Sequence, residues 1–167
     1  MEFELKAVSP QAVPRTLAKA ERYRLLNEPG EAESICLDVL EIEPANQEAL
    51  VMLLLAVTEQ FLEEPKRVAD ALATAAQLRD EYERAYYTGI VYERRARAQL
   101  RQGTPGAGSQ IYEWLRDAMA WYEKAEALRA PGNDDPLLRW NACARAIMHD
   151  RHLVPTSDER AEPLFLE

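Results

Sequence analysis

The sequence of 167 residues contains only two cysteines and two histidines. Cys36 and Cys143 lie far apart without CxxC spacing, so we expect both to be small buried apolar side chains in a reducing compartment. His149 and His152 are close enough to share a metal, but no third ligand is indicated, whereas closed zinc sites use four. The sequence therefore predicts neither a disulfide framework nor a metal site.

Motifs for phosphate binding and nucleophilic catalysis are also missing. There is no GxGxxG, and the stretch GTPGAG at 103–108 lacks both the following Lys-Ser/Thr and the preceding strand of a Walker loop. Both histidines lie near the C-terminus, away from any recognisable nucleophile. Adjacent acids such as Glu63 and Glu64 are expected as solvated helix faces in a chain with 29 acidic residues. We predict no enzymatic activity and no cofactor.

Long apolar runs are absent. The longest, Ala49 to Val57, is far shorter than the roughly 20 residues of a membrane span, and MEFELKAV at the start does not resemble a secretory signal. Twenty basic against 29 acidic residues give a net charge of −9, which disfavours binding to phosphate backbones and anionic membrane surfaces. We expect a cytoplasmic protein that binds neither nucleic acid nor membranes.

What the sequence does contain is helical periodicity throughout. No segment alternates with period two, and helix-favouring residues dominate, so we predict an all-α protein. Prolines, glycines and capping residues divide the chain into about seven helices joined by short loops. The expected helices cover residues 14–27, 31–43, 47–61, 66–79, 80–101, 110–128 and 134–150.

Several helix ends have local signals. Pro29 and Gly30 are predicted to end the first helix, and the second is predicted to stop before Pro44. Asn46 is a good N-cap for the third helix, and Ser109 is a candidate cap for the sixth.

The boundary near residue 80 is weakly marked. Asp80 with Glu83 three residues later resembles a capping box, which predicts a turn there. The alternative is one long helix from Lys66 to Arg101.

Internal repetition follows the same helices. Small or apolar residues recur at offsets 0, 4 and 7 in alternate helices, separated by 37 and 49 residues, and repeats at such spacing are typical of helical solenoids. The three triplets are Ala32, Cys36 and Val39; Ala69, Ala73 and Ala76; and Ala118, Tyr122 and Ala125. Pro44 follows the first triplet and Pro131 follows the third.

Residues 13 to 46 resemble a tetratricopeptide repeat (TPR). Matching positions are Ala20 and Tyr23 in the first helix, the triplet from Ala32 in the second, and Pro44 at the close. Gly89 and Tyr92, followed by the triplet from Ala118, resemble a third copy, which is stretched by about two turns in each helix. The middle copy matches only in its second helix.

The resemblance covers roughly residues 14 to 149 and implies a right-handed α-solenoid of antiparallel helical hairpins. It divides the chain into an extended N-terminal arm at 1–13, a single helical domain at 14–150 and a C-terminal tail at 151–167. The domain comprises repeats at about 14–45, 46–79 and 80–131 and a capping helix at 134–150.

The resemblance also implies a concave wall made by the first helix of each hairpin. This wall is apolar at its centre, with charges of both signs at its edges, and suits a peptide or helix of a partner protein. Its expected residues are Leu17, Glu21, Arg24, Val51, Leu55, Tyr86, Ile90, Glu93 and Arg94. Leu17 and Glu21 stand where the family's clamp for acidic chaperone tails needs Lys and Asn, which argues against that specificity.

Arginines crowd the end of the fifth helix, with tyrosines before them. They either stabilise the helix C-terminus electrostatically or form a basic, aromatic surface for an acidic peptide. The arginines are Arg94, Arg95, Arg97 and Arg101, and the tyrosines are Tyr82, Tyr86, Tyr87 and Tyr92. Trp114 and Trp121, one heptad apart, are expected in the core.

The function favoured by these patterns is a non-catalytic adaptor or scaffold that binds a partner protein. The alternatives are a cytoplasmic chaperone for secreted proteins and a sensor of a small ligand or signalling peptide. The apolar end of the tail, Pro163 to Glu167, is expected to dock in its own groove, to join two copies as a homodimer, or to fray.

Overall fold

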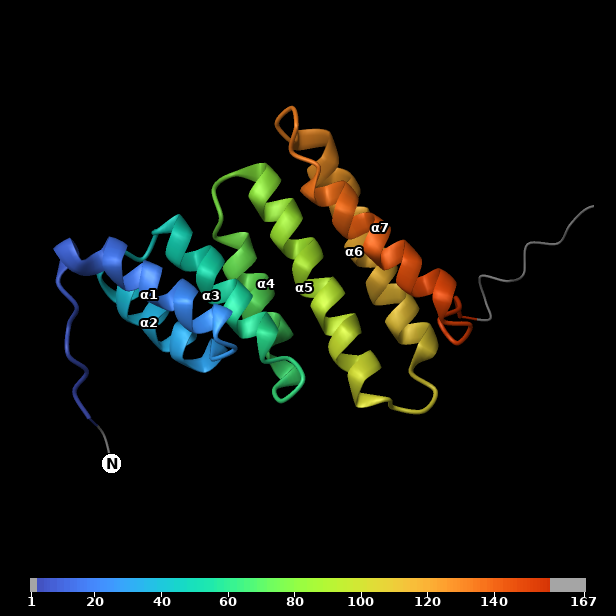
Figure 1. Cartoon of the computed structure of the whole chain (residues 1–167), viewed down its shortest axis with the longest axis horizontal. Helices are drawn as coiled ribbons and strands as arrows, with labels where there is room; N and C mark the ends of the chain where they lie inside the picture. The colour runs from blue at the N-terminus through green and yellow to red at the C-terminus, as the bar shows by residue number, and fades with distance from the viewer. Residues whose placement is uncertain (1–2, 157–167) are drawn as a thin grey trace, which may run out of the picture.

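The computed structural model describes residues 3–156, most of which are helical (Figure 1). The helices in this part of the chain are α1 (Val13–Leu25), α2 (Pro29–Ile42), α3 (Gln47–Glu59), α4 (Val68–Ala76), α5 (Glu81–Gln102), α6 (Gly108–Leu128) and α7 (Asp135–His149). Two short 3-10 helices, η1 (Pro10–Ala12) and η2 (Pro65–Arg67), precede α1 and α4. Residues 3–156 contain no strand, which confirms the predicted all-α class.

The helices follow one another along the long axis of the molecule, from α1 and α2 at one end to α6 and α7 at the other (Figure 1). Each helix packs against the next one in the sequence, and the pair α5 and α6 shares the most extensive interface. Beyond these neighbours, α1 also contacts α3, and α3 contacts α5. The odd-numbered helices α1, α3 and α5 therefore form a continuous row.

Two predicted helix starts are confirmed by their capping hydrogen bonds. The Asn46 side chain accepts a hydrogen bond from the backbone N–H of Ala49 at 2.9 Å, and α3 begins there. The Asp80 carboxylate accepts one from the N–H of Glu83 at 2.9 Å. Because α4 ends at residue 76 and Asp80 starts α5, the alternative of one helix from Lys66 to Arg101 is wrong.

Two other boundaries differ from the prediction. Pro29 and Gly30 do not end α1; they open α2, whose first position has no hydrogen bond for a proline to break. The chain reverses instead at Asn27, which has a left-handed φ of 61°. Ser109 does not cap α6, which begins one residue earlier, after Ala107, without a side-chain cap.

The packed part of the chain continues past residue 150. Leu153 is buried in the cluster around α6, and the backbone before it crosses Gly108. A Cβ at Gly108 would lie 2.1 Å from the carbonyl oxygen of His152, so this crossing requires glycine. The tail segment Pro163–Glu167 lies outside the described residues.

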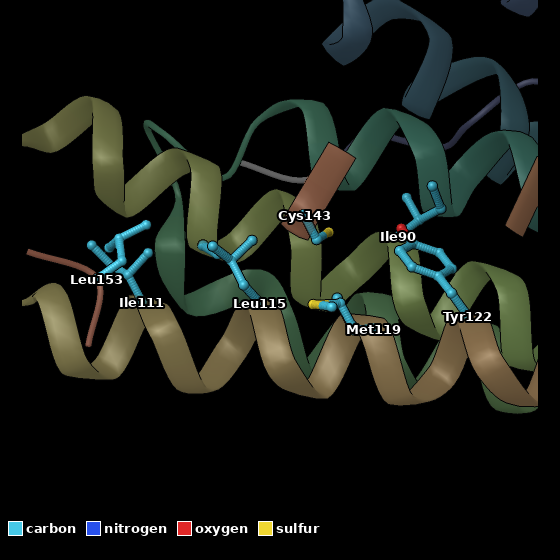
Figure 2. Packing of buried hydrophobic residues seen from close by; sticks show 9 residues of the cluster. Ile90, Ile111, Leu115, Met119, Tyr122, Cys143 and Leu153 are labelled. Atoms are coloured by element: carbon cyan, nitrogen blue, oxygen red, sulfur yellow. The ribbon is translucent and has the colours of Figure 1, made fainter. Parts of the chain in front are cut away.

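The core is divided into clusters along the row of helices. Ile111, Leu115 and Met119 of α6 line the largest, where Ile90 and Cys143 meet them from α5 and α7 (Figure 2). Smaller clusters join α1, α2 and α3, and a further cluster joins α3, α4 and α5.

Both cysteines are buried and free, as predicted. Burial raises the pKa of each thiol to about 12, with the charge of Arg24 opposing this at Cys36 and that of Glu93 adding to it at Cys143.

Candidate functional site

A hollow of about 270 Å³ opens on the row of odd-numbered helices. We call it the arginine hollow. Its charged lining consists of Glu59, Glu93, Arg94, Arg97, Arg101 and Arg139. Asn27, Thr58, Leu62 and Ala98 complete it. These residues belong to α3, α5 and α7 or follow directly after α1 and α3, so no even-numbered helix contributes to the lining.

One side of the arginine hollow is organised around Glu59. Its carboxylate accepts hydrogen bonds from Nη2 of Arg24 at 2.5 Å and from Nη1 of Arg94 at 3.3 Å. The same Nη1 of Arg94 donates to the Thr58 hydroxyl at 2.7 Å and to the Leu55 carbonyl at 3.0 Å. The side chains of this cluster therefore tie α1, α3 and α5 together.

The other side is organised around Glu93, whose side chain is fully buried. Its Oε2 accepts a hydrogen bond from the Tyr122 hydroxyl at 2.7 Å, and its Oε1 accepts one from Nε of Arg97 at 2.7 Å. Nη1 of Arg139 lies 3.5 Å from Oε1. A buried carboxylate is tolerated only when it is paired and hydrogen-bonded, and these three partners meet that need from α5, α6 and α7.

The ring of Tyr122 reaches Glu93 because Gly89 leaves room for it. A Cβ at position 89 would lie 2.5 Å from Cε1 of the Tyr122 ring. Gly89 and Glu93 are one helical turn apart, so they lie on the same face of α5. Burial and the negative charge of Glu93 both raise the pKa of the Tyr122 hydroxyl, which stays a protonated donor.

The lining carries a surplus of positive charge. It has four arginines against two glutamates, in a chain whose net charge is −9. Both glutamates are already bonded to arginines. Within residues 3–156, Arg101 has no carboxylate within 4.0 Å, and Arg97 donates only through Nε. The arrangement can therefore attract a negatively charged group.

The structure places three of the predicted wall residues away from solvent. Leu17 packs with Val39 and Ala49, and Ile90 belongs to the cluster of α6 and α7. Both are 2% exposed, and Glu93 is completely buried. The prediction that Leu17 and Ile90 lie on an exposed wall is wrong, because neighbouring helices cover that face of α1 and α5. Glu93 is equally buried but borders the arginine hollow, where it accepts a hydrogen bond from Arg97.

The other predicted wall residues keep some exposure. Arg24 and Arg94 meet at Glu59, and Leu55 supplies a carbonyl to Arg94. Glu21 is exposed on α1. Val51 and Tyr86 are half-buried.

The ring of Tyr86 packs among other tyrosines. It stacks on Tyr82 with ring centroids 5.8 Å apart and meets the edge of Tyr87 at 5.3 Å. Tyr86 also meets the Tyr122 ring at 5.9 Å, so the predicted tyrosine cluster on α5 packs partly against itself and partly against α6.

The predicted group of arginines on α5 divides between two faces. Arg94, Arg97 and Arg101 line the arginine hollow, whereas the guanidinium of Arg95 lies 3.9 Å from the ring centroid of Trp114. Trp114 and Trp121 are only half-buried, not core residues as expected.

A second, more apolar hollow of about 550 Å³ lies between α4, α5 and α6. Leu72, Tyr92, Trp121 and Leu128 contribute its apolar surface, and Lys124 lies over the Trp121 ring at 4.2 Å. The even-numbered helices α4 and α6 border this hollow, so it is separate from the arginine hollow.

Sequence reasoning missed Glu59 and Arg139. Glu59 follows Val51 and Leu55 at steps of four, so its place on the same face of α3 could have been predicted. Arg139 has no such signal, because its position depends on how α7 packs against α6.

Residues 3–156 contain no group of three or more His, Cys, Asp or Glu side chains placed to hold a metal. None of the helices in that range has the length and apolar composition needed to cross a membrane. The chain matches no protein-family model, no curated protein and no solved structure.

Proposed function

We propose that the chain is a non-catalytic protein-interaction module that binds a peptide or helix of a partner protein on its odd-numbered helices. The observation that carries this proposal is the arginine hollow, whose lining comes only from the odd-numbered helices and the residues after them. In a right-handed α-solenoid of TPR-like hairpins, the first helices of successive hairpins share one face, so a site spanning them follows the length of the stack.

The chemistry of this face supports a peptide as the ligand. Half-buried apolar side chains such as Val51 and Leu55 lie two turns and one turn before Glu59 on the same helix, so apolar surface adjoins the charged groups of the hollow. Such a mixture suits an extended segment that inserts a few anchors and makes polar contacts around them. The volume of about 270 Å³ lies below the roughly 300–1,000 Å³ of typical small-molecule sites.

An adaptor and a cytoplasmic chaperone for secreted proteins are two forms of the same proposal, because both hold a segment of another protein. The two free, buried cysteines fit a reducing compartment, which supports a cytoplasmic location.

The proposal is tested by selecting 12-residue peptides from a random display library with the full chain. The selected peptide is then titrated into 15N-labelled protein while amide chemical shifts are recorded. We expect the largest shifts in α1, α3, α5 and α7. Failure to select any peptide, or shifts concentrated in α2, α4 and α6, would contradict the proposal.

The apolar hollow between α4, α5 and α6 favours a second candidate, a sensor of a small apolar ligand. Its volume of about 550 Å³ falls within the usual range for such sites, and Trp121 borders it. The dye anilinonaphthalene sulfonate should then bind to the folded chain, and Trp121→Ala should weaken its binding. Equal binding to both chains would remove this candidate.

A further inference from the structure

Resting on the proposed peptide-binding function, we infer that the arginine hollow selects partners that insert a carboxylate side chain, Asp or Glu, into it. The first argument is charge. Four arginines line the hollow, and its two glutamates are already occupied within the protein. An entering carboxylate therefore meets positive charge that the chain has not neutralised.

The available donors suit a carboxylate. A guanidinium has five N–H donors in a planar fork that matches the two oxygens of a carboxylate. Arg97 donates to Glu93 through Nε alone, so neither of its Nη groups has an acceptor among residues 3–156. Arg101 is exposed in the last turn of α5 and donates to none of the described residues. Two forks thus remain free at the hollow.

Glu93 and Glu59 hold three of the four lining arginines in place before a ligand arrives, whereas Arg101 is exposed and is not held by either glutamate. The bond from Nε of Arg97 to the buried Glu93 holds that guanidinium at one end, and Arg139 is held near the same carboxylate. On the opposite side, the bonds of Arg94 to Thr58 and Glu59 hold its guanidinium. Arginines ordered in this way lose less conformational freedom on binding than free surface arginines do.

The size of the site limits what can enter. About 270 Å³ corresponds to roughly nine water molecules at 30 Å³ each, enough for one acidic side chain. Nucleotides and other drug-sized ligands usually occupy larger sites.

The surrounding charge adds specificity. The chain as a whole carries −9, so an acidic peptide is repelled by most of its surface and attracted at the arginine hollow. Because the peptide is attracted at the hollow and repelled elsewhere, the charges determine where its acidic residue lies more than they increase its affinity. The expected partner segment therefore has one or two acidic residues among apolar anchors.

The test uses an array of 12-residue peptides of random sequence, probed with the full chain. Each binding peptide is printed again with its Asp and Glu replaced by Asn and Gln. We expect the neutral analogues to bind about tenfold more weakly, and the acidic forms to lose affinity between 50 and 500 mM NaCl, as charge-assisted contacts do.

Two matched variants locate the effect. Arg101→Glu reverses a charge at the hollow, and Arg116→Glu reverses one on the exposed face of α6. Arg101→Glu should abolish most of the preference for acidic over neutral peptides, whereas Arg116→Glu should preserve it. The melting temperatures of both variants verify that they fold.

The outcomes separate this inference from the proposed function. If peptides bind but the acidic and neutral forms bind equally well, the acidic preference is overturned and peptide binding stands. If the acidic forms bind better but Arg101→Glu leaves the ratio unchanged, the assignment of that preference to the arginine hollow is overturned. If no peptide binds, the proposed function itself fails.

Discussion

The two halves of the molecule are stabilised by different kinds of packing. Helices α1 to α4 are 9 to 14 residues long, and one of the clusters that join α1, α2 and α3 consists largely of small side chains, including Ala20, Ala32 and Ala56. Larger side chains such as Leu54 and Phe61 fill the cluster between α3 and α4. Helices α5 and α6 have 22 and 21 residues and enclose the whole ring of Tyr122. Small residues let helices approach closely, whereas the longer pair has room for large side chains and must then satisfy their polar atoms.

Each half also has a carboxylate bonded to arginine, in a different setting. Glu33 of α2 pairs with Arg67 at 2.5 Å, and their side chains are 15% and 23% exposed. Glu93 of α5 is 1% exposed in its side chain. A carboxylate–arginine pair thus links helices at a water-accessible edge in the first half and in the protein interior in the second. Removing one partner should cost more stability in the interior, because the remaining charge is left buried and unpaired.

The largest effect expected from this comparison is that of Glu93→Gln. The substitution keeps the shape of the side chain but removes the negative charge beside Arg97 and Arg139. We expect the free energy of unfolding to fall by about 2–3 kcal/mol, against about 1 kcal/mol for Glu33→Gln. Urea denaturation of the three chains measures both losses, and equal losses would show that the two pairs do not differ in the proposed way.

The next effect concerns two glycines, one in each half. Gly89→Ala places a Cβ within 2.5 Å of the Tyr122 ring, which cannot move aside because it is buried and its hydroxyl is bonded to Glu93. We expect a loss of about 2 kcal/mol. In Gly30→Ala the nearest atom is 3.7 Å away, so stability should be unchanged or rise by up to about 1 kcal/mol.

Thermal unfolding of the two glycine variants provides the measurement. Gly89→Ala should melt several degrees below the parent chain, with Gly30→Ala at or above it. If both variants melt at the temperature of the parent chain, α5 and α6 are not as closely packed at Gly89 as described.

A smaller effect depends on pH. Hydrogen bonds from Arg67, opposed by burial, lower the pKa of Glu33 below its usual value. A carboxylate with a lowered folded-state pKa contributes stability that is present above its unfolded pKa of about 4.3 and is lost as pH falls through the folded value. The stability difference between the parent and Glu33→Gln should therefore be constant from pH 7 to 5 and shrink below pH 4.

Denaturant titrations at pH 7, 5 and 3.5 test this dependence. The stability difference between the parent and Arg67→Gln should shrink below pH 4 in the same way, because this substitution removes the principal hydrogen-bond donor to Glu33. A difference that grows toward low pH would contradict the assigned cause.

The smallest expected effect is chemical. Both thiols have a pKa of about 12 and are fully buried, so alkylation by iodoacetamide at pH 8 should require local opening of the helices. We expect Cys36, in the half with small core residues, to react faster than Cys143. Mass spectrometry of timed samples separates the two sites, and faster reaction of Cys143 would contradict the expectation that α2 opens more readily than α7.

Helix starts marked by local chemistry were predictable from the sequence. Asn46 and Asp80 cap their helices through their own side chains, so no knowledge of tertiary structure was needed. The prediction that Pro29 ends the first helix was wrong because a proline fits equally well after one helix or at the first position of the next. Ser109 misled because a suitable residue type does not guarantee that the helix starts after it.

The candidate site was only partly predictable, for a physical reason. Arg24, Leu55 and Arg94, which were grouped on one face by their spacing along the helices, do meet around Glu59, while their role in binding stays a prediction. Leu17 and Ile90 were expected on that face but are covered by neighbouring helices, which spacing within one helix does not reveal. Arg139 was missed because α7 reaches Glu93 only through the packing of separate helices.

The most direct test of the central claim is photo-crosslinking of the native partner. A benzophenone amino acid replaces Leu62, an exposed lining residue of the arginine hollow, or, as the control, Arg116 on α6, and each chain is irradiated in an extract of its source cells. We predict that position 62 crosslinks to a partner segment containing Asp or Glu and that position 116 does not. Crosslinking from position 116 alone, equal crosslinking from both, or none from either would contradict binding on the odd-numbered helices.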